Sequence, residues 1–234
     1  MHHGYDPTRH QERTGAPPYP YPGSIQPREP DDLYSSPPPW DIGHPQSAFL
    51  ALAKAGALHG RLLDVGCGTG EHALMAASLG LKATGVDLAS VALGKAEDKA
   101  RKRGLTARFL RHDARKLYEL GETFDTILDC GLFHIFGDVD RAEFVEALKS
   151  VVPSGGRYFM LGFSDQHPGD WGPHRLRREE ITSAFARGWE IDSLEPATIE
   201  VTTESDGIRA WLLAVTRMNE PPDWAAANRE RAQC

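Results

Sequence analysis

One short stretch carries most of the structural information in this chain: Leu62-Leu63-Asp64-Val65-Gly66-Cys67-Gly68-Thr69-Gly70. An apolar strand runs directly into three closely spaced glycines, and a helical pattern follows. Glycine allows the backbone to turn tightly and to approach a ligand where a side chain would collide. The helix that follows directs its unpaired N–H groups at the same point. The stretch therefore predicts the first strand–turn–helix unit of a doubly wound α/β fold.

The spacing of these glycines indicates which ligand the turn accepts. A dinucleotide site has the pattern G-x-G-x-x-G, whereas here Gly70 comes one position early and Glu71 stands in the place of the third glycine. We expect an acid at a helix N-terminus to repel a pyrophosphate and to tolerate a zwitterion. The spacing argues against a nicotinamide oxidoreductase. The alternative is a plain strand–helix turn in another α/β protein.

Acidic residues stand at the ends of the next three predicted strands. Asp87 comes about 20 residues beyond the glycine turn, where an acid can accept both ribose hydroxyls of an adenosine. Its alternative role is a helix N-cap. Asp113 can accept an exocyclic amine such as adenine N6, and Asp129 ends the fourth strand. Because ligands bind at the carboxyl ends of the strands in such a sheet, these acids predict one ligand site.

The rest of the chain alternates predicted strands and helices, which is typical of a parallel sheet with helices on both faces. A final pair of strands indicates an antiparallel edge. The expected class is therefore α/β: a doubly wound, Rossmann-like sheet, mostly parallel with an antiparallel edge strand. Beyond the first strand, we expect helices at 46–57, 71–79, 90–103, 138–151 and 178–187, and strands at 82–87, 107–112, 124–129, 157–163, 190–194 and 208–216.

With these elements in order, residues 61–217 resemble the class I S-adenosylmethionine-dependent methyltransferases. The resemblance implies S-adenosyl-L-methionine as cofactor and methyl transfer as the reaction. The matching segments are LLDVGCGTG (62–70), GVDLA (85–89), HDARKL (112–117), FDTILD (124–129) and VVPSGGRYFML (151–161). The resemblance also implies that Asp64, Gly66, Gly68 and Gly70 cradle the methionine part, that Asp87 holds the ribose and that Asp113 contacts the adenine amine, with further cofactor contacts from Trp40, Cys67, Leu88, Ala114 and Asp129.

A second resemblance lies upstream, in DDLY (31–34) and PPPWDIGHPQ (37–46). These segments are similar to those of small-molecule methyltransferases that act on thiopurines, thiols and halides, and of bacterial enzymes that methylate heterocyclic toxins and hydroxyquinolinones. His44 departs from the arginine or glutamate of that group. The resemblance implies that the segment folds over the cofactor and helps to close a substrate pocket.

Methyl transfer is an in-line displacement that needs alignment and an acceptor in its reactive state. A thiolate or an acidic hydroxyl needs little help, whereas a neutral hydroxyl needs a base, and histidine suits that role. His134, just past the fourth strand, is our candidate base, and Asp32 is a candidate to orient it or the substrate. The alternatives are a packed histidine that holds the loop and an N-cap role for Asp32.

Aromatic residues near the strand ends suggest a pocket for a flat heterocycle. Trp40, Phe133, Phe163 and Trp171 are the candidates, together with His134, and their faces would also attract a sulfonium. For Phe163 the alternative is core packing at the end of a strand. The acceptor atom stays open between oxygen, nitrogen and sulfur.

Composition limits the possible partners. The 234 residues are 40% hydrophobic and carry a net charge of −7, so no nucleic-acid or anionic-membrane surface is expected. The three cysteines, Cys67, Cys130 and Cys234, have no metal-ligand spacing, so no metal is expected. We find no apolar run that could span a bilayer. A cytoplasmic monomer or homodimer with a small-molecule substrate is expected.

The chain divides into four expected parts. Residues 1–30, rich in proline and tyrosine, form a disordered tail. Residues 31–57 form a cap segment and helix that close the active site, residues 58–218 the methyltransferase domain, and residues 219–234 a C-terminal tail.

Two other functions are alternatives to methylation of a small molecule. A macromolecule-directed methyltransferase acting on adenine N6 has Asn/Asp-Pro-Pro-aromatic after the fourth strand, and one acting on protein arginines has a double-glutamate loop. The sequence Asp129-Cys130-Gly131-Leu132 matches neither. A protein that binds S-adenosylmethionine without transferring its methyl group stays as an alternative.

Overall fold

The chain is described by a computed structural model that covers residues 29–169 and 171–219. The tails expected at 1–30 and 219–234 lie outside these residues, apart from their innermost positions. Within the described part, no helix is long and apolar enough to cross a membrane. The first element is a 3-10 helix, η1 (Pro30–Tyr34), which packs against the third α-helix.

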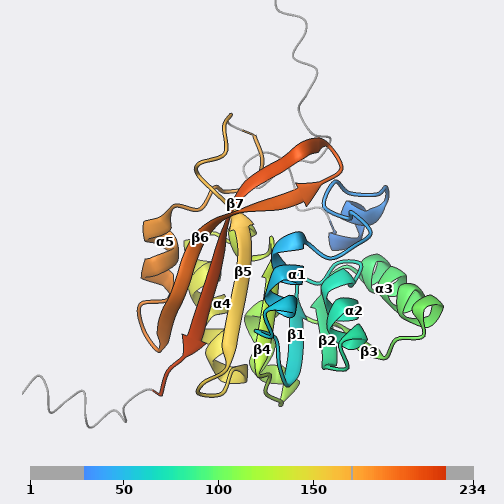
Figure 1. The fold of residues 1–234 in the computed structure, drawn as a ribbon, viewed down its shortest axis with the longest axis horizontal. Helices are drawn as coiled ribbons and strands as arrows, with labels where there is room; N and C mark the ends of the chain where they lie inside the picture. The colour runs from blue at the N-terminus through green and yellow to red at the C-terminus, as the bar shows by residue number, and fades with distance from the viewer. Residues whose placement is uncertain (1–28, 170, 220–234) are drawn as a thin grey trace, which may run out of the picture.

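Seven strands form one sheet in the order β3-β2-β1-β4-β5-β7-β6 (Figure 1). The first five strands pair in parallel, and β7 runs antiparallel to both β5 and β6. The antiparallel strand therefore lies one place inside the edge, which β6 forms. The expected α/β class is confirmed. The strands are β1 (Arg61–Val65), β2 (Lys82–Asp87), β3 (Ala107–Arg111), β4 (Thr126–Cys130), β5 (Arg157–Phe163), β6 (Trp189–Val201) and β7 (Glu204–Arg217).

Helices cover both faces of the sheet. In Figure 1, α1 and α2 lie in front of the strands and α4 lies behind them. Phe49 of α1 and Ala73 of α2 join the core on one face, whereas Phe144 of α4 and Ile181 of α5 join the core on the other. The helices are α1 (Ser47–Lys54), α2 (Glu71–Ser78), α3 (Ser90–Arg103), α4 (Asp138–Val151) and α5 (Arg178–Ala184), with two further 3-10 helices, η2 (Ala114–Leu120) and η3 (Phe133–Ile135).

Several element bounds agree with the sequence and others differ for a physical reason. The helices expected at 90–103 and 138–151 are confirmed. The closing strands are longer than expected, since β6 continues through Pro196. An edge strand tolerates proline, because on its outer side no neighbouring strand needs a hydrogen bond from its backbone N–H groups. Irregular pairing at 191–193 and 199–201 also breaks the alternation that a sequence pattern detects.

The core beneath α4 and α5 is rich in stacked rings. Tyr158 stacks on Phe185 with ring centroids 5.4 Å apart, and Phe133 stacks on the same ring at 5.7 Å. All three side chains are buried. Full burial of a large apolar side chain stabilises a fold by about 1.5–3 kcal/mol. This packing joins the start of β5, through Tyr158, to the segment that follows β4, through Phe133.

Candidate active site

The glycine turn lies between the end of β1 and the start of α2. Gly66, Gly68 and Gly70 have φ angles of +64°, +51° and +83°, which side chains other than glycine rarely adopt. A Cβ atom on Gly70 would lie 2.7 Å from the Cβ of Ala96, and one on Gly68 would lie 2.7 Å from the hydroxyl of Tyr34. The turn is therefore closed on both sides, and glycine is required by conformation and by space.

Asp87 supports this turn from the end of β2. Its carboxylate accepts the N–H of Gly68 and the N–H of Ala89, both at 2.8 Å. Burial raises the pKa of Asp87, and these hydrogen bonds oppose the rise. The residue that precedes α3 is Ala89, so the alternative N-cap role of Asp87 is not observed. The backbone of Leu88 also donates to this carboxylate, and since a carboxylate has about four acceptor sites, capacity is left for a ribose hydroxyl.

Asp64 lies buried at the end of β1, with 1% of its surface exposed. One carboxylate oxygen accepts the N–H of Ala73 at 3.1 Å. The other, Oδ1, has no hydrogen-bond partner among the described residues, and its nearest cation-forming neighbour is Nδ1 of His72 at 3.8 Å. Burial, and then the nearby Asp129 and Asp87, raise the pKa of Asp64. A buried oxygen without a donor indicates that a ligand or water supplies one.

Asp113 is engaged by its own neighbour. It accepts the backbone N–H of Arg115 at 2.9 Å and two guanidinium nitrogens of the same residue at 3.1 and 2.7 Å. Arg115 also reaches Asp140 at 2.7 Å. The hydrogen bonds from Arg115 hold the pKa of Asp113 below its ordinary value. The sequence predicts that Asp113 accepts an adenine amine, and the ion pair with Arg115 is an addition that the structure makes.

Asp129 is fully buried and acts within the turn after β4. It accepts the N–H groups of Leu132 at 2.8 Å and Phe133 at 3.1 Å, and the hydroxyl of Tyr158 at 2.8 Å. Burial raises its pKa to about 6, against the effect of these hydrogen bonds. Three donors from the protein therefore hold Asp129 as a structural part of this turn, and its cofactor contact stays an expectation.

His134 lies in η3 and is 8% exposed. Its Nδ1 accepts the backbone N–H of Phe163 at 3.0 Å. Burial, with a smaller effect from His174, lowers its pKa to about 3. A neutral imidazole that accepts at Nδ1 carries its proton on Nε2 and has no free lone pair for a substrate proton. This geometry favours the packed role over the base.

Asp32 lies on a different element from His134. It is exposed within η1, which packs against α3, and its backbone carbonyl accepts the hydroxyl of Ser35. The residue that caps a helix is its neighbour Asp31, whose carboxylate accepts the N–H of Val91 at 2.8 Å. The expected pairing of Asp32 with His134 is corrected, since the two residues lie on different elements and no hydrogen bond joins them within the described structure.

The four expected pocket aromatics do not form one cluster. Phe133 is fully buried in the core, with the guanidinium of Arg141 5.2 Å from its ring centre, so its expected place in a pocket is corrected. Phe163 is 1% exposed and packs 5.8 Å from the half-buried ring of Trp171. Trp40 packs edge-on against another ring, Tyr34, at 6.4 Å.

Tyr34 is the residue that the sequence analysis missed at this site. Its hydroxyl faces Gly68 and lies 3.5 Å from the indole N–H of Trp40. Burial, and then the charge of Asp87, raise the pKa of the phenol, which therefore stays protonated. The available signal was its place in DDLY, directly before the PPPWDIGHPQ segment. The 30–46 segment thus lies over the glycine turn through Tyr34.

The interpretation of Glu71 also requires a correction. Its carboxylate accepts two guanidinium nitrogens of Arg103 at 2.7 and 2.9 Å, and the ammonium of Lys99 lies 2.8 Å away. Burial raises the pKa of Glu71, but these two cations outweigh it and lower the value. The charge of Glu71 is compensated, so it does not by itself repel an anion. The argument against a dinucleotide rests on the glycine spacing alone.

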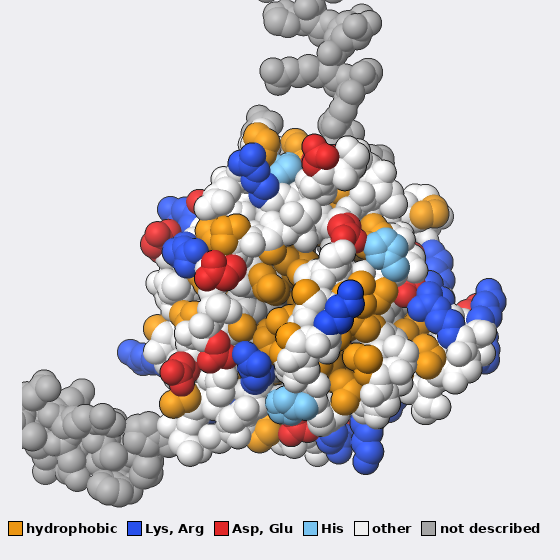
Figure 2. Space-filling model, viewed as in Figure 1, with side chains coloured by type: hydrophobic (Ala, Val, Ile, Leu, Met, Phe, Trp, Pro, Cys, Tyr) orange, Lys and Arg blue, Asp and Glu red, His pale blue; other side chains and the backbone are white. Residues whose placement is uncertain are grey.

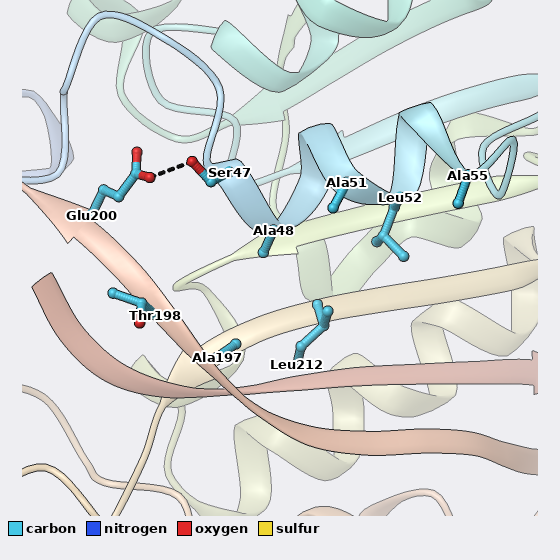
Figure 3. Close-up of a pocket in the computed structure, with 9 residues that line it drawn as sticks. All are labelled: Ser47, Ala48, Ala51, Leu52, Ala55, Ala197, Thr198, Glu200 and Leu212. Atoms are coloured by element: carbon cyan, nitrogen blue, oxygen red, sulfur yellow. Dashed lines mark hydrogen bonds between the residues drawn. The ribbon is translucent and has the colours of Figure 1, made fainter.

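A separate cavity of about 510 Å³ lies away from this turn, between α1 and the β6–β7 pair (Figure 3). Figure 2 shows hydrophobic side chains gathered in this part of the front face. Small and apolar side chains form most of its wall, and the hydroxyl of Ser47 donates to the carboxylate of Glu200 at one end. The cavity holds none of the expected site residues.

Comparisons with known proteins agree with this geometry. A family described as "Methyltransferase domain" matches residues 62–156. The 2-heptyl-1-hydroxyquinolin-4(1H)-one methyltransferase of Mycobacteroides abscessus is 33% identical over 165 residues, which cover 69% of this chain and 73% of the relative. A structure solved for the conversion of a disulfide bond into a thioacetal group during echinomycin biosynthesis is 35% identical, with a TM-score of 0.73 over 86% of this chain and 97% of that one.

The magnesium protoporphyrin IX methyltransferase of Synechocystis PCC 6803, solved with bound S-adenosylmethionine, shares the fold at 20% identity, with a TM-score of 0.58 over 73% of this chain and 76% of that one. The chain belongs to the S-adenosylmethionine-dependent methyltransferases. Its cofactor is S-adenosyl-L-methionine, which supplies an electrophilic methyl group on a sulfonium. The unpartnered oxygen of Asp64 and the remaining acceptor capacity of Asp87 fit this cofactor.

Proposed function

We propose that this methyltransferase acts on a small-molecule acceptor, either a heteroaromatic hydroxyl or ring nitrogen or a thiol. The observation that carries the proposal is the 30–46 segment, which lies over the glycine turn through Tyr34 and Trp40. Such a cover restricts access to the methyl group and suits a small acceptor better than a polymer. The two relatives above, named for a hydroxyquinolinone and for a disulfide-to-thioacetal conversion, support the same class.

We assign the cofactor contacts as follows. Gly66, Cys67, Gly68 and Gly70 form a cradle for the methionine part, and the free oxygen of Asp64 lies beneath it. Asp87 accepts the ribose hydroxyls. Leu88, Asp113 and Ala114 surround the adenine, where the exposed side chain of Leu88 directly follows Asp87.

For the acceptor side, we propose a wall made by Trp171 above Phe163. The backbone carbonyls of His167 and Trp171 accept the guanidinium of Arg175 at 2.6 and 2.8 Å, and the same cation lies 5.1 Å from the ring centre of Phe163. Arg175 thereby orders the loop that carries Trp171. Its donors are used by the protein, so it is a positioning residue for the loop.

The reaction needs no protein base if the acceptor ionises unaided. The acceptor lone pair forms a bond to the methyl carbon, the carbon–sulfur bond breaks, and its electron pair stays on sulfur. The sulfonium charge is lost, so alignment is the main requirement. Since His134 accepts from Phe163, we propose that it holds the end of β5 and that the acceptor is acidic, such as a thiol or a heteroaromatic hydroxyl.

We also propose a cytoplasmic location, which Cys67 and Cys130 support because both are free thiols. A monomer or homodimer, without nucleic-acid or membrane partners, stays our expectation. The net charge of −7 supports the absence of polyanionic partners.

A screen with labelled S-adenosylmethionine tests the proposal. Heteroaromatic phenols, hydroxyquinolones, thiols and halides are offered in parallel with protein and nucleic-acid extracts. We expect labelled product from at least one heteroaromatic or thiol compound. Labelling of a macromolecule alone would favour a macromolecule-directed enzyme. Cofactor binding without any labelled product would favour a binding protein.

A further inference from the structure

A directed chain of hydrogen bonds joins three separate segments at the glycine turn. The ammonium of Lys99, on α3, donates to the hydroxyl oxygen of Thr69 at 2.7 Å. The hydroxyl of Thr69 donates in turn to Oδ1 of Asp41 at 2.7 Å. An ammonium has donors only, so the Thr69 oxygen must accept from it and its proton is free for Asp41. The chain therefore runs from α3 through the turn to the 30–46 segment.

The charges around this chain are balanced and largely shielded from water. The side chains of Asp41 and Lys99 are 16% and 24% exposed. Lys99 also pairs with Glu71, whose second cation is Arg103. Two cations thus face two carboxylates. Removing Lys99 leaves Asp41 and Glu71 as like charges in a partly buried place, where repulsion is stronger than at the surface.

Thr69 occupies the tip of a turn that has little stiffness of its own. Gly68 and Gly70 flank it, and both have positive φ. Asp87 holds the turn from below through the N–H of Gly68. The Thr69 hydroxyl joins the turn to Asp41. The glycine turn is therefore held at Gly68 by Asp87 and at Thr69 by Asp41.

The 30–46 segment is also tied at each end. Near its start, the ammonium of Lys95 donates to the carbonyl of Tyr34 at 3.2 Å. At its end, Gln46 pairs with the backbone of Glu200. Asp41 supplies a contact between these two, directly after Trp40. This contact joins the middle of the segment to the turn beneath it.

We propose that Lys99 is a positioning residue that acts on Asp41 chiefly through Thr69, with a longer direct contact of 3.5 Å to Asp41 Oδ1, and that it seats the 30–46 segment on the glycine turn and thereby sets the affinity for S-adenosylmethionine. Lys99 needs no contact with cofactor or acceptor for this role. The inference rests on the cofactor of the family and not on the identity of the acceptor.

Calorimetric titration of the full chain with S-adenosylmethionine and with S-adenosylhomocysteine tests the proposal. Thr69→Val, Lys99→Met and Asp41→Ala should each weaken both affinities about tenfold. Thr69→Ser keeps the hydroxyl and should stay within about threefold of the native protein. Lys102→Met is the matched control, since Lys102 is exposed on the same helix, and it should bind as the native protein does.

A double variant shows whether the residues act as one hydrogen-bonded chain or contribute independently to cofactor affinity. The double variant Asp41→Ala/Thr69→Val should bind about as weakly as the weaker single variant, because either change breaks the same chain. Losses that multiply would overturn the proposal. So would native affinity in Lys99→Met, or a Thr69→Ser variant as weak as Thr69→Val, since then the hydroxyl is not the group that matters.

Proteolysis gives a second measurement that does not need the Thr69 variants to fold. Chymotrypsin cleaves after aromatic residues, and the 30–46 segment holds Tyr34 and Trp40. Lys99→Met should be cut in this segment several-fold faster than Lys102→Met, and S-adenosylmethionine should slow the cleavage. Equal cleavage rates in the two variants would show that Lys99 does not seat the segment.

Discussion

The side-chain amide of Gln46 hydrogen-bonds both backbone groups of Glu200. Its Nε2 donates to the Glu200 carbonyl at 3.0 Å, and its Oε1 accepts the Glu200 N–H at 2.7 Å. Gln46 is 2% exposed, and Glu200 lies where the pairing of β6 is irregular. The amide thus takes the place of a missing strand neighbour and joins the 30–46 segment to the β6–β7 pair.

Replacing Gln46 by alanine should lower the free energy of unfolding by about 1–3 kcal/mol. The change leaves the N–H and the carbonyl of Glu200 without partners in a poorly solvated place. Urea unfolding monitored by circular dichroism measures the loss. Gln166→Ala is the control, because its side chain is exposed, and it should change stability by less than about 0.5 kcal/mol. Equal stability of the two variants would contradict the role given to Gln46.

Replacing Asp87 by alanine should weaken S-adenosylmethionine binding about ten- to a hundredfold. The variant loses the acceptor proposed for the ribose and the support of the Gly68 N–H, a charge-assisted loss of about 1.5–3 kcal/mol. Asp87→Asn keeps one acceptor oxygen, and its affinity for S-adenosylmethionine should lie between those of the native protein and Asp87→Ala. Calorimetry measures the affinities. Unchanged affinity in a folded Asp87→Ala variant, or tight binding of NADH by the native protein, would contradict the assignment.

The structure gives a clear boundary for a truncation experiment. Removing residues 1–28 should leave cofactor affinity and activity nearly intact, because Asp31, which makes a contact with α3 within residues 29–169 and 171–219, is kept by this truncation. Removing residues 1–46 should abolish cofactor binding, since Tyr34, Trp40 and Asp41 are then lost from the glycine turn. Calorimetry on both truncated chains measures this, with thermal melting to show that each folds. A chain without residues 1–46 that folds and binds normally would contradict the role of the segment.

The sheet and the glycine turn could be predicted from the sequence because both depend on local residue patterns. Apolar runs of strand length and closely spaced glycines need no information from distant residues. Asp64 and Asp87 could be placed at strand ends for the same reason. The edge strand β6 was underestimated because Pro196 and two irregular pairs interrupt its alternation. Those interruptions are tolerated only where a strand has a free side, which is a property of the whole sheet.

The roles of single side chains could not be predicted where they depend on distant partners. Asp129 accepts the hydroxyl of Tyr158, and His134 accepts the backbone N–H of Phe163. Each of these partners lies 29 residues away, on β5. Phe133 is aromatic and follows a strand end, as a pocket residue would, but it stacks on Phe185 in the core. The link from Lys99 to Asp41 likewise joins segments 58 residues apart. No pattern within either segment indicates these pairs.

Replacing His134 separates its two roles. Asparagine can place an acceptor oxygen near Nδ1 and keep the hydrogen bond from Phe163, but it cannot act as a base. If His134 holds the end of β5, His134→Asn should retain kcat within about tenfold once an acceptor is known, whereas His134→Ala should lose stability. A kcat lowered about a hundredfold in His134→Asn, with intact cofactor binding and loss of the acidic limb of the pH–rate profile, would restore the base role.

The pH dependence of stability provides the last test of the same residue. Burial lowers the pKa of His134 to about 3 and that of His72 to about 4, from an ordinary value of 6.5. Below about pH 6.5 the unfolded chain therefore binds protons that the folded chain does not, and the free energy of unfolding falls as the pH falls. Each histidine contributes a slope of up to about 1.4 kcal/mol per pH unit down to about pH 4. Urea unfolding at several pH values should show a shallower slope in His134→Asn than in the native protein. An unchanged slope would mean that His134 is protonated in the folded state and not held neutral by burial.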